Sequence, residues 1–206
     1  KYAKFTDNSK LQNTATSILH HVLENGFIDE ETGFIIGYRD TQKDQFCLNF
    51  KHNNDWFCPG SMAKIAYQLL IFSDIIDSVR QATSVSSREL QRRMRKISIN
   101  TAKWLYANVK PADNGWYPRR TTPDGEHYYE RAEGGKDPFF DGSADGLFVI
   151  QLMTELTLRG LADWRKEISD RVAVFIENNG IYGSINHDTY DAHENVAYSV
   201  AFRTLR

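Results

Sequence analysis

Two carboxylates stand near the expected start of a helix. Asp141 and Asp145 are four positions apart, so they share one face if both are helical. One could be a general acid, and the other, or a carboxylate across a cleft, a base or nucleophile, as glycoside hydrolysis requires. The competing interpretation is structural, because an Asp at a helix N-terminus caps backbone N–H groups and complements the helix dipole.

A second ionisable group opens the last expected helix. Here His193 could move protons near neutral pH, and Asp191 or Glu194 could supply the second carboxylate. An Asp followed three residues later by a Glu is also the pattern of a capping box. This group therefore carries the same two interpretations as the first.

The longest stretch without helical periodicity, 110–140, contains a third group. Tyr128 or Tyr129 with His127 could transfer a proton, and Arg119 or Arg120 could bind a carboxylate, which is what β-elimination at a uronic acid needs. The same residues could form a polar rim. We favour a functional role, because paired tyrosines beside a histidine in a long loop have no core-building explanation.

Aromatic residues gather in or beside the expected loops. Their flat faces can stack on sugar rings while polar tips reach hydroxyls. The alternative is that they plug the ends of the helices. We expect substrate contacts from Trp56, Trp116, Tyr117, Tyr128 and Tyr129.

The elements that would position these residues form a threefold repeat of helix, turn, loop and helix. The first helix of each unit stops at an Asn-Gly pair, namely Asn25-Gly26, Asn114-Gly115 and Asn179-Gly180. The expected helices are 9–25, 60–81, 86–109, 141–160, 162–179 and 191–204. Short β-like runs predict a small hairpin near 33–50.

The two helices of each unit differ in pattern. The first is amphipathic, as Ile18 and Leu19 with Val22 illustrate, whereas the second is apolar nearly all round, as in 65–72. An amphipathic helix keeps one face in solvent, and a helix that is apolar on every side is surrounded by protein. The alternation therefore predicts an inner layer of helices wrapped by an outer layer.

The Asn-Gly-aromatic stops, the buried second helices and the helix openings at 57–61 and 140–143 resemble those of α/α-toroid proteins. This group includes the six-hairpin glycosidases and the toroid polysaccharide lyases. The resemblance implies an all-α toroid or partial toroid, with its site in the loops that lead into the inner helices. Here those loops are 27–60, 110–142 and 180–192.

This chain offers fewer hairpins than a closed toroid of about six. We expect one domain, 1–206, built from hairpins at about 9–81, 86–160 and 162–204. A homo-oligomer, or the remainder of a longer chain, would complete the ring, because a half barrel would expose its inner apolar faces.

Composition excludes several other classes. The formal net charge of −2 gives no basic footprint for nucleic acid, and the basic run 88–96 is expected to be the solvated face of a helix. No apolar run approaches the roughly 18 to 20 residues that span a bilayer, so no membrane insertion is expected. Phosphate-loop, dinucleotide and zinc motifs are missing from the sequence, so we expect no cofactor and no metal.

Three hypotheses follow. The first is a glycoside hydrolase with paired carboxylates at the mouth of a helical barrel, and its partner would be an oligo- or polysaccharide. The second is a polysaccharide lyase acting on uronate-containing glycans through Tyr, His and Arg. The third is a noncatalytic helical-repeat domain that binds a glycan or a protein. A polymeric substrate would favour a secreted or periplasmic location.

Overall fold

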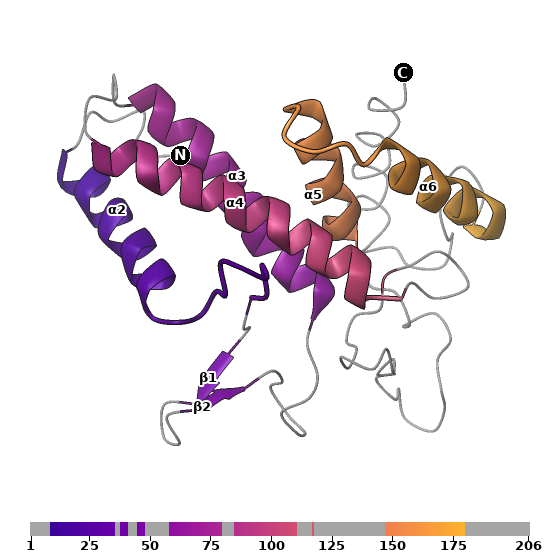
Figure 1. The fold of residues 1–206 in the computed structure, drawn as a ribbon, viewed down its shortest axis with the longest axis horizontal. Helices are drawn as coiled ribbons and strands as arrows, with labels where there is room; N and C mark the ends of the chain where they lie inside the picture. Colours follow the sequence, from indigo (N-terminus) through magenta and orange to yellow (C-terminus); the bar gives the residue numbers. More distant parts are fainter. Residues whose placement is uncertain are drawn as a thin grey trace.

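The computed structural model describes residues 9–35, 38–40, 45–47, 58–79, 85–110, 117 and 147–179. Most of them are helical (Figure 1). The helices are α2 (Ser9–Glu24), α3 (Pro59–Val79), α4 (Val85–Asn108), α5 (Leu147–Leu158) and α6 (Arg165–Asn179). They confirm the all-α class and match the first five expected helices, while 191–204 lies outside the described residues.

A short antiparallel hairpin follows α2, as the sequence predicts. Its strands are β1 (Tyr38–Asp40) and β2 (Gln45–Cys47), with Arg39 opposite Phe46. Just before it, an isolated bridge joins Ile28 to Ile35. Further along, Cys58 lies directly before α3 and is half-buried.

Amphipathic spacing explains how α4 packs. Leu90, Met94, Ile97 and Leu105 recur at intervals of three, four and eight residues and are all buried, whereas the charged residues between them reach the surface. The same pattern places Leu19 of α2 in the core. It was wrong about one neighbour, because Ile18 is 60% exposed.

Three helices are expected to be surrounded by protein, and the two that the structure describes, α3 and α5, differ from one another. Nearly every described side chain of α5 from Val149 to Thr157 is buried or half-buried, as predicted. Helix α3 instead keeps an exposed stripe at intervals of three and four residues. The stripe consists of Ser61, Lys64, Gln68 and Phe72. The expectation of complete burial is therefore wrong for α3, because its polar residues fall on one side.

Helix α3 is the centre of the described core. It packs most extensively against α4 and next against α5, and α4 also touches α5. In Figure 1, α3 and α5 both run upward while α4 runs the opposite way, and α6 follows α5 after a short turn. The first residues of α3 and α5 and the last residues of α4 consequently lie toward the same side of the fold.

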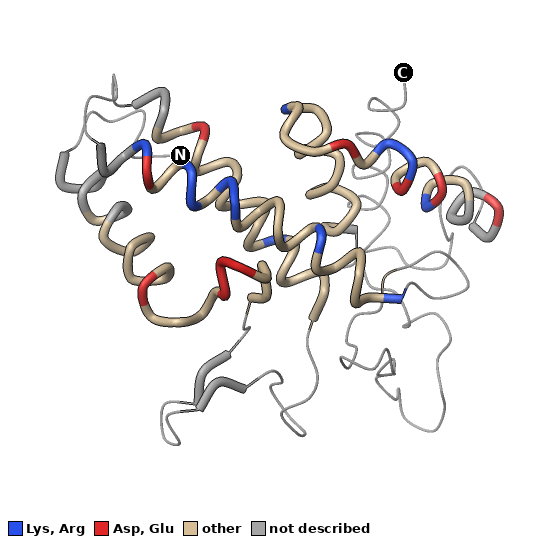
Figure 2. The backbone as a smooth tube through the Cα atoms, in the orientation of Figure 1, with Lys and Arg blue, Asp and Glu red and all other residues tan. Residues whose placement is uncertain are grey.

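Ion pairs fix the loop after α2 onto α4. The Arg93 guanidinium lies 2.6 Å from a carboxylate oxygen of Glu24 and 2.5 Å from one of Glu30. Lys96 and Glu31 pair at 2.5 Å. Figure 2 shows this acidic loop beside the basic stretch of α4. The basic run expected to be a solvated face is exposed at Arg88, Arg92 and Lys96, whereas Arg93 and Arg95 are half-buried. Carboxylates distant in sequence neutralise part of its charge.

Neutral contacts tighten the same junction. The backbone carbonyl of Gly33 accepts a hydrogen bond of 2.7 Å from Thr101 Oγ1, and Asn100 Nδ2 donates to the Glu30 carbonyl at 2.9 Å. Residues 30–33 are therefore held along about two turns of α4. The segment that continues into β1 thus leaves from a fixed point on the core.

Candidate functional site

The predicted site residues fall mostly outside the described part of the chain. Tyr117 is described, and the others are not. Those that lie outside the described residues are Trp56, Trp116, Arg119, His127, Tyr128, Tyr129, Asp141, Asp145, Asp191, His193 and Glu194. Their roles stay predictions.

Tyr117 lies in the core, with 3% of its surface exposed. Its hydroxyl donates to Glu167 Oε1 at 3.3 Å, and the same oxygen accepts a 2.7 Å hydrogen bond from Arg171 Nε. Burial, reinforced by the negative charge of Glu167, raises the pKa of Tyr117, so the phenol remains a neutral donor. The Tyr117 ring therefore packs in the core, which was the alternative to a role in stacking on a sugar. Its hydrogen bond to Glu167 attaches it to α6.

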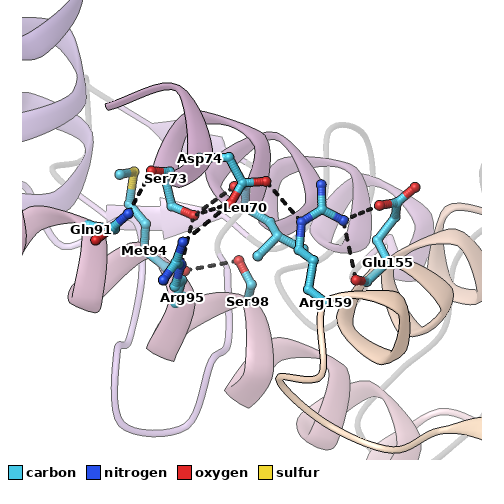
Figure 3. A network of polar contacts seen from close by, with 9 residues as sticks. All are labelled: Leu70, Ser73, Asp74, Gln91, Met94, Arg95, Ser98, Glu155 and Arg159. Atoms are coloured by element: carbon cyan, nitrogen blue, oxygen red, sulfur yellow. Dashed lines mark hydrogen bonds and ion pairs between the residues drawn. The ribbon is translucent and has the colours of Figure 1, made fainter. Parts of the chain in front are cut away.

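A different set of polar residues meets where α3 packs against α5. Asp74 of α3 accepts a 2.9 Å hydrogen bond from Arg159 Nε, just beyond α5, and a 3.4 Å one from Arg95 of α4 (Figure 3). Arg159 also forms an ion pair with Glu155 of α5. One carboxylate on α3 thus connects all three helices.

Hydrogen bonds behind Asp74 hold this arrangement in place. Ser73 is fully buried, and its hydroxyl donates to the Leu70 carbonyl at 2.7 Å while accepting from Arg95 Nε at 3.3 Å. Gln91 of α4 donates to the Ser73 carbonyl at 3.1 Å (Figure 3). The polar atoms are therefore paired, as burial requires.

Tyr67 lies two helical turns before Asp74 on the same helix. Partial burial raises the pKa of its phenol, Glu155 raises it further, and Arg159 and a hydrogen bond with Gln151 oppose the rise. The Tyr67 phenol of α3 is therefore close enough to Gln151 and Glu155 of α5 for both side chains to influence its pKa. At neutral pH it is an uncharged hydrogen-bonding group.

Nearer the beginning of both helices, the Lys64 ammonium lies 5.0 Å from the centre of the Phe148 ring. Three contacts therefore follow one another along the boundary between α3 and α5. Lys64 meets Phe148, Tyr67 lies near Gln151 and Glu155, and Asp74 pairs with Arg159. We call this row of side chains the α3–α5 seam. It consists of Lys64, Tyr67, Asp74, Phe148, Gln151, Glu155 and Arg159.

The two ends of the seam suit different tasks. At the far end, Arg159 pairs with both Asp74 and Glu155, and Arg95 of α4 pairs with Asp74, so these ion pairs join the helices to one another. At the near end, Lys64 is exposed and Tyr67 and Gln151 are half-buried. The seam therefore has one end that is held by ion pairs and another end at which polar and aromatic side chains are exposed or half-buried.

Sequence reasoning missed the seam because its residues lie inside helices interpreted as apolar. A signal was present, since Gln151, Glu155 and Arg159 recur every four residues through the apolar run of α5. Among the described residues, no group of three or more His, Cys, Asp or Glu could hold a metal ion. No described helix has the length and apolar character to cross a membrane.

Comparisons with known proteins add no identity. No protein-family model, no curated protein and no solved structure matches this chain.

Proposed function

We propose that this chain is a carbohydrate-active enzyme with an α/α-toroid architecture, and that it acts as a glycoside hydrolase. The observation that supports the proposal best is the relation between α3 and α5. They lie side by side and run in the same direction, with the oppositely directed α4 against both (Figure 1). Alternating inner and outer helices of a toroid would have this order.

The shared direction of α3 and α5 also indicates where the site of the proposed enzyme would lie. In the sequence, the predicted site loops 27–60 and 110–142 come before α3 and α5, and the first residues of these two helices lie toward one side of the fold (Figure 1). In the proposed enzyme, Asp141 or Asp145 supplies one acid/base group. The second comes from Asp191, His193 or Glu194.

Product masses test the reaction class directly. Folded protein is incubated with a panel of neutral and uronate-containing oligosaccharides, and products are measured by mass spectrometry. Products that sum to substrate plus one water support hydrolysis. An unsaturated product without added water replaces hydrolysis with elimination, which directs attention to His127, Tyr128 and Tyr129. A folded protein that yields no product contradicts the enzymatic proposal and favours a binding module.

Carboxamide variants then test the carboxylates. Asp145→Asn and Glu194→Gln should each lower kcat by about 100-fold or more while sugar still binds, because a positioned acid or base contributes at least that factor. Asp170→Asn is the matched control, because Asp170 is an exposed carboxylate on α6. Equal rates for all three variants would contradict the assigned roles.

A further inference from the structure

The Asn25 side chain, which directly follows α2, is held in one orientation by His21. Asn25 Nδ2 lies 2.7 Å from the backbone carbonyl oxygen of His21, one helical turn earlier. A carbonyl oxygen only accepts hydrogen bonds, so this contact identifies the amide atom as the nitrogen. The same nitrogen lies 2.9 Å from Nδ1 of the His21 ring. The amide nitrogen of Asn25 is therefore in direct contact with an imidazole, a group that exchanges protons near neutral pH.

The residue after Asn25 is a glycine with an accessible backbone. Gly26 is exposed and has φ 70°. With no Cβ, it does not shield its backbone nitrogen from the neighbouring side chain. Asparagine is one of the chemically labile residues of proteins, and an unhindered following nitrogen is the nucleophile in its breakdown. Asn25-Gly26 thus combines an accessible nucleophile with a leaving nitrogen that contacts a proton donor.

We propose that Asn25 is a site of spontaneous deamidation and that His21 gives a proton to the leaving nitrogen. The Gly26 nitrogen loses its proton to water and attacks Asn25 Cγ, and a cyclic imide forms when the Cγ–Nδ2 bond breaks. His21 Nδ1 protonates the departing Nδ2, which leaves as ammonia, and the ring recovers a proton from water. Water then opens the imide to aspartate or isoaspartate. In total, one water is consumed and one ammonia is released.

The new carboxylate would stand where a negative charge is unfavourable. Residue 25 follows the C-terminus of α2, where the helix dipole repels an anion. Glu24 and Glu30 already share the guanidinium of Arg93 at this junction. Isoaspartate also adds a methylene to the main chain between α2 and the loop that is held against α4. Deamidation should therefore loosen the attachment of α2 to α4. This inference does not depend on the proposed function.

The rate of deamidation at Asn25 tests the role of His21. Peptide mapping by mass spectrometry measures this rate in the full chain, incubated at neutral pH. His21→Ala and His21→Gln should each slow it by about tenfold, which is less than a positioned acid contributes in an enzyme. The glutamine variant retains a hydrogen-bonding side chain that does not titrate near neutral pH, so it separates proton transfer from simple holding.

A neighbouring histidine and the unfolded chain supply the controls. His20→Ala should leave the rate unchanged, because His20 is exposed on the same helix but lies five positions before Asn25, and residues four apart are the ones that face each other. In concentrated urea, the wild type and all three variants should deamidate Asn25 equally, since the helix that brings His21 to Asn25 is lost. Circular dichroism establishes that each variant is folded without urea.

Hydrogen exchange tests the structural consequence. Amides of α2 should exchange faster in aged wild type than in fresh wild type. Asn25→Ala cannot deamidate at this position, so its α2 amides should exchange alike before and after ageing. Equal exchange in fresh and aged wild type, with Asn25 deamidated, would overturn the predicted loosening.

Other results would overturn the chemistry. If Asn25 deamidates in urea and stays intact in the folded wild type, the fold protects the residue and the site is wrong. If His21→Gln deamidates at the wild-type rate, the ring does not act as the proton donor. Faster deamidation of folded His21→Ala would show that the contact protects the amide, which reverses the role proposed for His21.

Discussion

Gly33 lies directly against the backbone of Thr101. A Cβ atom placed on Gly33 would come within 2.2 Å of both the Thr101 nitrogen and the Asn100 carbonyl carbon, and its φ is +80°. The Thr101 hydroxyl donates to the carbonyl of the same glycine at 2.7 Å. The loop after α2 therefore approaches α4 as closely as two backbones can, and a residue without a side chain makes the approach possible.

This contact predicts a large effect of Gly33→Ala. Backbone strain and steric overlap act together, so the free energy of unfolding should fall by about 2 to 5 kcal/mol. Gly160→Ala is a matched control, because Gly160 also has positive φ (+65°) but nothing lies within 4 Å of an added Cβ. It should cost only the strain, about 1 to 2 kcal/mol. Urea unfolding of both variants makes the comparison, and equal losses would contradict the close approach.

Arg93 should be the most important charge of that junction. It is 23% exposed and pairs with Glu24 and Glu30, from α2 and the following loop. Arg93→Ala should lower the free energy of unfolding by about 1 to 3 kcal/mol, because hydrogen bonds to charged groups are lost. Arg92→Ala is the control, since Arg92 is 78% exposed and pairs within its own helix. Its effect should stay within about 0.5 kcal/mol.

The same junction should weaken in acid. Arg93 lowers the pKa of Glu24 below its ordinary value of 4.5, first through the hydrogen bond and then through its charge. A lowered folded-state pKa contributes stability above the unfolded value, and this contribution is lost as the pH falls below about 4.5. Chemical unfolding from pH 7 to pH 3 should show a shallower decline in Arg93→Met than in the wild type. Parallel profiles would show that the carboxylate is not linked to folding through Arg93.

Local structure could be predicted from local pattern. The Asn25-Gly26 stop is confirmed, because α2 ends at Glu24 and Gly26 has φ 70°. Apolar periodicity likewise placed α3, α4 and α6 to within a few residues, because those signals depend on neighbours along the chain.

Pairings distant in sequence could not be predicted in this way. Arg93 meets Glu30 across 63 positions, and Asp74 meets Arg159 across 85. No sequence period encodes such contacts, since they depend on how the helices cross. The exposed stripe of α3 was missed for the same reason, because which side of a helix is covered depends on its neighbours. Of the predicted site, the described residues include Tyr117.

Asp74 should couple more strongly to Arg159 than to Arg95. The hydrogen bond from Arg159 is 2.9 Å long, and the one from Arg95 is 3.4 Å. Double-mutant cycles with alanine should therefore give the larger coupling energy for Asp74 with Arg159, on the order of 1 kcal/mol for a pair that is only partly buried. Urea unfolding of the single and double variants provides the energies. A larger coupling to Arg95 would contradict the geometry of the seam.

We expect the Tyr117 phenol to lower the free energy of unfolding in alkali, and we expect Tyr117→Phe to remove this pH dependence. Burial and the charge of Glu167 raise its pKa above the ordinary value of 10.0. A raised folded-state pKa means that the stabilisation is complete below pH 10 and is lost as the pH rises beyond it. Tyr117→Phe should cost about 1 kcal/mol at pH 7, through the lost hydrogen bond to Glu167, and should then decline less from pH 9 to pH 11. Tyr106→Phe is the control, because Tyr106 is 55% exposed. If both variants follow the alkaline profile of the wild type, the Tyr117 phenol is not the buried group that links alkaline pH to unfolding.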